Sequence, residues 1–299
     1  MPNPIKRITR NLRDLKVGRK SYEAGLLAKV VQVDAAKSAV VDRYLDLMRD
    51  VMIGRLTRDP AQPYITRPQI EASGPDFVIQ PVAYDEATRD NGLDWPMTAF
   101  SMIGTKRMDN LRGICIAAIA DGVGGDFVET GVWRGGACIF MRAILEAHGC
   151  TDRKVWVCDS FEGLPPPDAG EFPADEGLNL NEYDGLSISL EAVQDNFRSF
   201  GLLDGQVEFV KGWFKDTLHV APIERIAVLR LDGDLYQSTI EALEALYPKV
   251  SPGGYVIVDD YGAFEACRKA VHDYLGKIGS GDITLANIDG IGAWFQKPA

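Results

Sequence analysis

Short runs of β-branched and apolar residues alternate with helical patterns from residue 126 onward, and this alternation constrains the fold more than any other feature of the chain. The runs are "DFVET" (126–130), "KVWVCD" (154–159), "VEFVKG" (207–212), "IAVLRLD" (226–232) and "GYVIVDD" (254–260). Nearly continuous Val, Ile and Leu between helices is typical of a parallel sheet that is covered on both faces. "ITLANID" and "GAWFQK" near the C-terminus predict two more strands, as a closing antiparallel pair. We therefore predict an α/β fold with a mostly parallel sheet.

The helical patterns divide the chain into two parts. Three of them, "ACIFMRAILEAH", "SLEAVQDNFRSFG" and "LYQSTIEALEALYPKV", separate the predicted strands, and "NLRGICIAAIADGV" precedes the first strand. Residues 22–56 space their apolar residues at three and four, which indicates a helix. Residues 57–96 are rich in proline and polar residues, which favours a connecting segment with short structure. We predict a helical N-terminal extension with its connecting segment at 1–96 and the main domain at 97–299.

Carboxylates follow two of the predicted strands at the point where the apolar run stops. Asp232 closes the strand in "LRLDGDLYQST", and Asp259 and Asp260 close the strand in "YVIVDDYG". Parallel sheets bind ligands at the carboxyl ends of their strands, so these three side chains are expected to converge. Without a counter-ion they would repel one another and their pKa values would rise. Oxygen ligands of this kind favour Mg²⁺ over zinc. The alternative is that each acid is solvated or caps a helix.

A glycine loop links the first of these strands to a helix in "DFVETGVWRGGACIFM". Its spacing, Glu129-x-Gly131-x-x-x-Gly135, differs from the G-x-G-x-x-G of a dinucleotide fold. The helix that follows presents free N–H groups at its positive end. Asp159 closes the next strand, where an acid can accept both hydroxyls of a ribose. A nucleoside cofactor without a pyrophosphate fits this pattern better than NAD, and S-adenosylmethionine is such a cofactor. The alternative is that Asp159 caps the next helix.

Three further features surround this predicted cofactor site. Gly212 and Trp213 end the third strand, and Trp213 either packs on adenine or belongs to the core. Ser189 is an N-cap for the helix "LEAVQDNF", with cofactor contact as the alternative. The segment 162–185 contains seven acids, four prolines and no basic residue. A loop of this length is unusual unless it is functional, so we interpret it as a lid over the substrate, with a disordered insertion as the alternative.

A dication beside a methyl donor indicates a particular reaction. An alcohol attacks the sulfonium methyl in line only when its proton leaves, and a bound dication lowers the pKa of a hydroxyl. A carboxylate within reach then takes the proton. We predict that Asp234, two residues after Asp232, is this general base; its alternative role is to cap the helix "LYQSTIEALEAL".

Composition excludes several other classes of protein. The net charge of −11 argues against a nucleic-acid or anionic-membrane partner, and no run of 18 apolar residues is present. Residues 1–22 are basic, but the apolar stretch of a secretion signal does not follow them. We interpret them as a solvated arm or an oligomer contact. We also predict a homo-oligomer. None of the five cysteines belongs to a C-x-x-C motif, which favours reduced thiols in a cytoplasmic protein. The three histidines lack metal-ligand spacing.

At this point the chain resembles the macrocin-type O-methyltransferases, which are metal-dependent enzymes that methylate sugar hydroxyls on antibiotics. The resemblance covers about residues 97–299 and is carried by "SMIGTKRMDNL", "FVETGVWRGGACIFMRAIL", "VWVCDSFEGLPPPD", "GWFKDTL", "LRLDGDLYQSTIEALEALYPK" and "GGYVIVDDYGA". It implies a Rossmann-like class I methyltransferase sheet. It implies S-adenosylmethionine contacts at Met102, Glu129, Gly131, Asp159 and Ser160. It also implies a Mg²⁺ site at Asp232, Asp259 and Asp260, with Asp234 as the general base.

The leading hypothesis is therefore a Mg²⁺- and S-adenosylmethionine-dependent O-methyltransferase that acts on a small natural product, at a sugar hydroxyl. The first alternative is the same chemistry on a phenol, a catechol or an intermediate tethered to a carrier protein. An NAD-dependent oxidoreductase is an alternative from another class, and the glycine spacing counts against it. A non-catalytic scaffold is a third alternative, and the intact "DGD" and "DD" motifs count against that.

Overall fold

The structure is a computed structural model that describes residues 38–298. By its internal contacts the chain forms two units, Met1–Asp46 and Leu47–Ala299. The described part of the first unit, residues 38–46, is helical. The basic arm at 1–22 and the first part of the helix expected at 22–56 lie outside the described residues. Residues 47–96 are grouped with the sheet, and the division of the chain near residue 97 stays a prediction.

The second unit is built on one large sheet. Its seven strands within the described residues lie in the order β5-β4-β3-β6-β7-β9-β8. Their bounds are β3 Asp126–Thr130, β4 Val155–Asp159, β5 Val207–Lys211, β6 Ile226–Leu231, β7 Val250–Val258, β8 Ala286–Asn287 and β9 Ala293–Gln296. Strands β3 to β7 are parallel, and β9 and β8 complete the sheet in antiparallel pairing. The predicted mostly parallel sheet with a closing antiparallel pair is confirmed.

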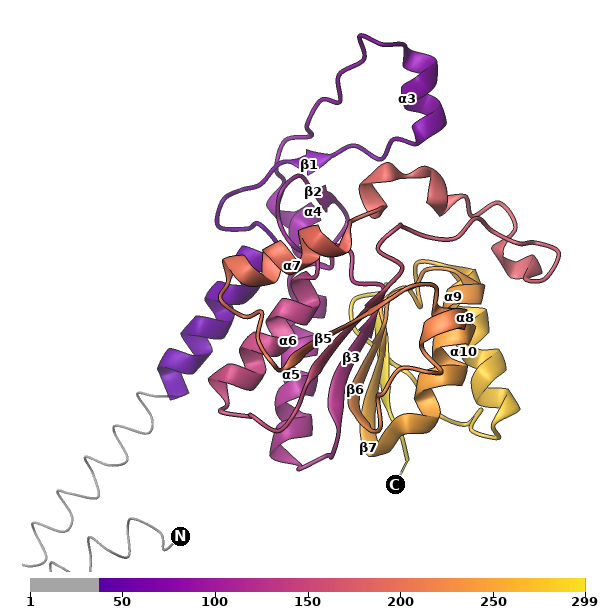
Figure 1. Cartoon of the computed structure of the whole chain (residues 1–299). Coiled ribbons are helices and arrows are strands. Elements are labelled where there is room, and N and C mark those ends of the chain that lie inside the picture. The colour runs from indigo at the N-terminus through magenta and orange to yellow at the C-terminus, as the bar shows by residue number, and fades with distance from the viewer. Residues whose placement is uncertain (1–37, 299) are drawn as a thin grey trace, which may run out of the picture. The chain divides into compact units, whose positions relative to one another are not determined.

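Helices cover both faces of this sheet, as the apolar strands require (Figure 1). One face carries α5 (Gly104–Ala120), α6 (Gly136–Ala147) and α7 (Leu190–Ser199), and the other carries α8 (Phe214–Thr217), α9 (Tyr236–Leu246) and α10 (Glu265–Lys277). All six residues of β6 are buried, and so is nearly all of α6. This continuous burial explains why neither sequence alternates between apolar and polar residues. Among the described helices, none has the length and apolar character needed to cross a bilayer.

Short helices and strands precede the sheet, in the segment 57–96 that the sequence predicted to be a connection. They are β1 (Ala61–Gln62), α3 (Arg67–Ser73), α4 (Glu86–Asp90) and β2 (Trp95–Pro96), with β1 and β2 paired antiparallel. A fully buried arginine, Arg89, holds this region together. Its guanidinium donates to both oxygens of Asp94, at 2.7 and 3.0 Å, and to the carbonyls of Ile53 and Asp59. A buried charge needs such partners, and here they give the polar segment a fixed structure.

Strand register brings the ends of three strands together. Thr130 of β3 pairs with Leu231 of β6, which in turn pairs with Val258 of β7. The residues that follow these positions therefore emerge side by side at the carboxyl edge of the sheet. The chain order also reverses between β3 and β6, and open α/β sheets bind their ligands at this kind of switch point.

Candidate active site

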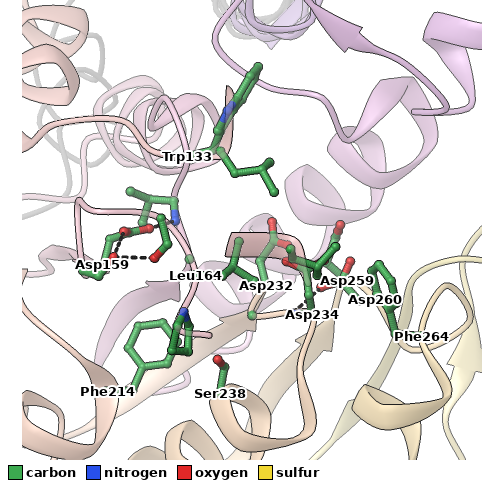
Figure 2. Close-up of a pocket in the computed structure, with 18 of the residues that line it drawn as sticks. Trp133, Asp159, Leu164, Phe214, Asp232, Asp234, Ser238, Asp259, Asp260 and Phe264 are labelled. Atoms are coloured by element: carbon green, nitrogen blue, oxygen red, sulfur yellow. Dashed lines mark hydrogen bonds between the residues drawn. The ribbon is translucent and has the colours of Figure 1, made fainter. Parts of the chain in front are cut away.

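A cavity of about 740 Å³ opens at this edge of the sheet. Ten of the residues predicted from the sequence line it: Met102, Glu129, Gly131, Asp159, Ser160, Trp213, Asp232, Asp234, Asp259 and Asp260. Gly135, Ser189 and Gly212 are not among its lining residues. Figure 2 shows Asp159 on one side of the cavity and the four aspartates of the "DGD" and "DD" motifs together on the other. The cavity thus has a glycine-loop side and a carboxylate side.

On the carboxylate side, Asp232, Asp259 and Asp260 converge as the strand pattern predicted. One oxygen from each lies within 4.8 Å of the others. The convergence follows from register, because the Asp259 N–H donates to the carbonyl of Leu231 at 2.8 Å and the Asp232 N–H donates to that of Thr130 at 2.9 Å. Three oxygen donors at this spacing are suited to a hard dication such as Mg²⁺.

Two buried arginines that the sequence analysis did not identify neutralise part of this charge. Arg230 contacts Glu129, the Oδ2 atom of Asp232 at 2.7 Å and the Oδ1 atom of Asp259 at 2.5 Å. Arg107 contacts Asp259 and, at 3.2 Å, Asp289. Arg230 was detectable in principle, because it is the one charged side chain inside the apolar run "IAVLRL". Arg107 gave no such signal, because it stands among polar residues in "SMIGTKRMDNL".

The crowding of charge changes the acidity of the carboxyls. Burial, followed by the charges of Asp232 and Asp259, raises the pKa of Asp234 to about 8. Burial and the neighbouring aspartates also raise the pKa of Asp260 well above its ordinary value. Burial acts on Asp259 in the same direction, but Arg107 and Arg230 outweigh it and hold its pKa below the ordinary value. Carboxyls that resist ionisation this strongly fit a site that a cation completes.

Asp234 occupies a turn between β6 and α9 and does not cap the helix. Its backbone is left-handed, with φ of 58°, and its N–H donates to the Oδ2 atom of Asp260 at 3.2 Å. The N-cap position of α9 belongs to Leu235, whose side chain makes no capping hydrogen bond. The capping role that the sequence offered as the alternative for Asp234 is therefore not what the structure shows.

On the glycine-loop side, the glycines are required by packing. Gly131 has φ of 81°, and a Cβ there would lie 1.6 Å from the carbonyl oxygen of Asp232. Gly135 has φ of 83°, and its Cβ would lie 2.8 Å from the side chain of Val193 on α7. Only glycine lets β3 and β6 approach this closely at their ends. Gly131 also lines the cavity, whereas Gly135 seats the loop on α7.

Glu129 and Asp159 are both held by hydrogen bonds in this structure. The Glu129 carboxylate accepts from Arg230 and, at 2.7 Å, from the Sγ atom of Cys138, and burial raises its pKa to about 7. Asp159 accepts backbone N–H groups from Val132 and Phe161, each at 2.7 Å. Asp159 thus joins the glycine loop to the turn after β4 and does not cap a helix.

Two of the predicted cofactor residues that do not line the cavity have structural partners elsewhere. The hydroxyl of Ser189 accepts from the Ala192 N–H at 3.2 Å as the N-cap of α7, as the first interpretation expected. Gly212 has φ of 137°, and a Cβ there would meet Thr217 at 2.6 Å, so it is required for the turn into α8. Trp213, the next residue, does line the cavity.

The acid-rich segment (162–185) forms part of the cavity wall. It contains three short 3₁₀ turns, η2 (Pro173–Asp175), η3 (Leu180–Glu182) and η4 (Asp184–Leu186). Its front part, which we define as residues 163–171, contributes Leu164, the three prolines and Asp168 to the lining. In the view of Figure 2, Leu164 lies between Asp159 and the carboxylate group, and the front part forms one wall of the cavity. The sequence also did not identify the aromatic lining residues Trp133, Phe214 and Phe264.

Known proteins are similar to this chain over most of its length. A family model described as Macrocin-O-methyltransferase (TylF) matches residues 41–297. This match begins well before residue 97, where the resemblance in the motifs begins, and it includes every predicted site residue.

Individual relatives are similar over most of the chain. A Streptomyces olivaceus enzyme named 8-demethyl-8-(2,3-dimethoxy-alpha-L-rhamnosyl)-tetracenomycin-C 4'-O-methyltransferase is 50% identical over 260 residues, which are 86% of this chain and 94% of the relative. Demethyldecarbamoylnovobiocin O-methyltransferase of Streptomyces niveus is 45% identical over 272 residues, or 91% and 99% of the two chains. The solved structure of the O-methyltransferase NovP is similar with a TM-score of 0.79 and 46% identity, covering 87% of this chain and 100% of that one.

Proposed function

Because the chain belongs to the macrocin-O-methyltransferase family, we propose that it methylates a sugar hydroxyl of a glycosylated natural product in a Mg²⁺-dependent reaction. Membership of the family makes the protein an S-adenosylmethionine-dependent O-methyltransferase, as predicted from its motifs. The sugar acceptor is supported by the rhamnosyl group in the name of the Streptomyces olivaceus relative. The single observation that carries the proposal is the convergence of three carboxylates beside a half-buried fourth one, Asp234, at the switch point of the sheet.

The glycine-loop side is proposed as the cofactor site. When bound, S-adenosylmethionine supplies an electrophilic methyl group. Asp159 is proposed to accept the ribose hydroxyls. Its Oδ2 atom receives the Val132 N–H and retains a second lone pair, whereas its Oδ1 atom receives the Phe161 N–H and, at 3.4 Å, the Ser160 hydroxyl. Gly131 leaves the loop backbone open to the cavity, and Met102, Glu129 and Ser160 complete this wall. Trp213 is proposed to pack on the adenine from the start of α8.

The carboxylate side is proposed as the cation site, with Asp232, Asp259 and Asp260 as ligands. A bound Mg²⁺ supplies a positive charge that lowers the pKa of an acceptor hydroxyl. Arg230 and Arg107 hold Asp259 from behind, so its orientation is set before any ligand enters. The carboxylates outnumber these two guanidiniums, which leaves negative charge for a cation to balance.

Asp234 is proposed as the general base that takes the proton from the acceptor hydroxyl. Its pKa of about 8 is close to neutral pH, and a carboxylate with this pKa is a far stronger base than one with the ordinary pKa of an aspartate. Its neighbour Asp260 fixes the turn through the Asp234 N–H. A base two residues from one cation ligand and bonded to another is in a position to reach the hydroxyl of a bound acceptor.

Two assays test the proposal. S-adenosylhomocysteine should raise the melting temperature, NAD should not, and Asp159→Ala should weaken the shift. Mass spectrometry should then show a gain of one methyl group on glycosides of natural products, and none on the matching aglycones. Methylation of an aglycone phenol with no reaction at the sugar would overturn the sugar assignment. Stabilisation by NAD alone would argue against the cofactor site.

The site gives no evidence on the predicted oligomeric state or on the predicted cytoplasmic location. We keep the homo-oligomer as a proposal, to be tested by light scattering coupled to gel filtration; a mass of one chain of 32.8 kDa would contradict it. The cytoplasmic location likewise stays a prediction from the reduced cysteines.

A further inference from the structure

A fully buried aspartate, Asp175, lies in the middle of the otherwise polar acid-rich segment. Its Oδ1 atom accepts the N–H of Tyr236 at 2.6 Å, and its Oδ2 atom accepts the N–H of Gln237 at 3.0 Å. Both donors belong to the first turn of α9. Asp175 is 61 residues away from Tyr236 in the chain, so the contact joins two separate parts of the cavity wall.

The first turn of α9 depends on this contact. The first N–H groups of a helix have no partner within the helix, and a neighbouring side chain or water must satisfy them. Leu235, at the N-cap position, has no side-chain oxygen and makes no side-chain cap. A carboxylate at a helix N-terminus also interacts favourably with the helix dipole, and its hydrogen bonds are charge-assisted. Asp175 therefore replaces the missing cap from a distant segment.

Packing around Asp175 strengthens the same contact. The η2 turn, which contains Asp175, contacts both α9 and α10. The ring of Phe172 lies 6.1 Å from the ring of Tyr236, measured between centroids. The carbonyl of Asp175 accepts the N–H of Leu178, and its own N–H donates to Phe172, so the turn is closed on itself. The middle of the acid-rich segment is thus anchored to α9.

The anchored helix begins directly after the proposed base. Asp234 is two residues before Tyr236, and its left-handed backbone leads into Leu235 and α9. We propose that Asp175 is a positioning residue: it fixes the first turn of α9, and through it the Asp234 turn. This inference rests on the proposed function for the role of Asp234, but the cap can be measured without any turnover.

The test compares Asp175→Asn with Glu176→Gln, which removes a charge from the next residue of the same segment. Glu176 is exposed and does not line the cavity. Asp175→Asn replaces one acceptor oxygen by an NH2 donor, so at least one of the amides of Tyr236 and Gln237 should exchange with solvent deuterium roughly fivefold to tenfold faster, which corresponds to the loss of a helix cap. The kcat should fall by about tenfold to a hundredfold, as expected when a reacting group is misplaced. The dissociation constant for S-adenosylhomocysteine should stay that of the wild type, and Glu176→Gln should match the wild type throughout.

Several results would overturn the inference. Tyr236 and Gln237 amides that exchange in the wild-type protein as fast as exposed amides would show that there is no cap. Faster exchange in Asp175→Asn with unchanged kcat would show a cap that does not position the base. If Asp175→Asn does not fold, Asp175→Ser, which keeps one side-chain oxygen and presents no NH2 group to the helix, takes its place, and the wild-type exchange still decides whether the cap exists. A capped wild-type protein without methyl transfer to any glycoside would instead count against the proposed function.

Discussion

Arg230 is the residue on which the charge balance of the site depends. Its buried guanidinium contacts Glu129, Asp232 and Asp259, which come from three different strands or strand ends. Removing one member of a buried ionic group leaves the others as unpaired charges, and this costs more than the pair itself contributes. The stability of the unligated protein should therefore respond strongly to this position.

We expect Arg230→Met to lower the free energy of unfolding by about 3–5 kcal/mol, measured by urea denaturation. The matched control is Arg198→Met, which removes an arginine from an exposed ion pair with Asp195 on the surface of α7. Exposed pairs contribute little, so this control should stay close to the wild type. Equal effects of the two substitutions would show that Arg230 is not the central counter-charge.

A second comparison at the residue scale distinguishes the two roles proposed for the aspartates, which are cation ligand and general base. Asp260→Asn should weaken cation binding, so that high Mg²⁺ restores part of its activity. Asp234→Asn should bind the cation nearly as the wild type does but lose about 10²–10⁴-fold in turnover, because an amide cannot accept the proton. Higher pH should partly restore Asp234→Asn, since solvent can then remove the proton, and extra metal should not. Wild-type turnover in Asp234→Asn would assign the base to another group.

At the scale of elements, the close approach of β3 and β6 explains Gly131. A Cβ at this position would lie 1.6 Å from the Asp232 carbonyl oxygen, whereas the Cβ of an alanine at Gly149, with φ of 65°, would meet nothing within 4 Å. Both substitutions place alanine in the left-handed region, which costs about 1–2 kcal/mol. Gly131→Ala should cost about 1–3 kcal/mol more than Gly149→Ala in thermal or urea unfolding, because the strand ends must separate. Equal losses would show that the turn alone, and not the strand contact, requires glycine.

The acid-rich segment is a second element whose parts should behave differently. Its middle is anchored by Asp175, and its end by the Arg67–Asp184 ion pair and by the Trp133 indole, which donates to the Gly185 carbonyl at 2.8 Å. The sequence alone indicated a lid or a disordered insertion over 162–185, where acids and prolines leave little to bury. The anchors narrow this expectation to the front part, residues 163–171.

A glutamate-specific protease tests the narrower expectation. Glu171 is exposed in the front part, whereas Glu182 lies half-buried in the η3 turn. Cleavage after Glu171 should be faster than after Glu182, and it should slow when S-adenosylhomocysteine and an acceptor glycoside are added together. Equal cleavage after Glu171 with and without these ligands would remove the reason to regard the front part as a lid.

At the scale of the whole molecule, the effect of Mg²⁺ on the stability of the protein should depend on pH. The pKa of Asp234 is about 8 in the folded state, against about 4 for an unfolded aspartate, so the folded state holds an extra proton between these values. The stability of the metal-free protein should therefore fall as pH rises across this window. Mg²⁺ binds the ionised carboxylates, so it should raise the melting temperature more at pH 8 than at pH 6. Asp260→Asn should lose most of this difference, and a pH-independent effect of Mg²⁺ would contradict the cation site.

Much of the fold and the site followed from local patterns in the chain. The apolar runs became β3 to β7, because a buried parallel strand needs an unbroken apolar stretch. Acids placed at the ends of two such runs came together, because strand ends in a parallel sheet share one edge and here are in register. The glycine loop and the O-methyltransferase family were likewise evident from motifs that are short and continuous.

The tertiary structure alone decided which charges meet, because these contacts join residues far apart in the chain. Arg107 reaches Asp259 across 152 positions, and Asp175 reaches α9 across 61, with no local pattern that marks either pair. The requirement for glycine at Gly131 also depends on the tertiary structure, because it comes from a carbonyl group at the end of a neighbouring strand. Periodicity and turn signals describe how a segment folds on its own. The neutralisation of a buried carboxylate and the capping of a distant helix depend on which segments the sheet brings together.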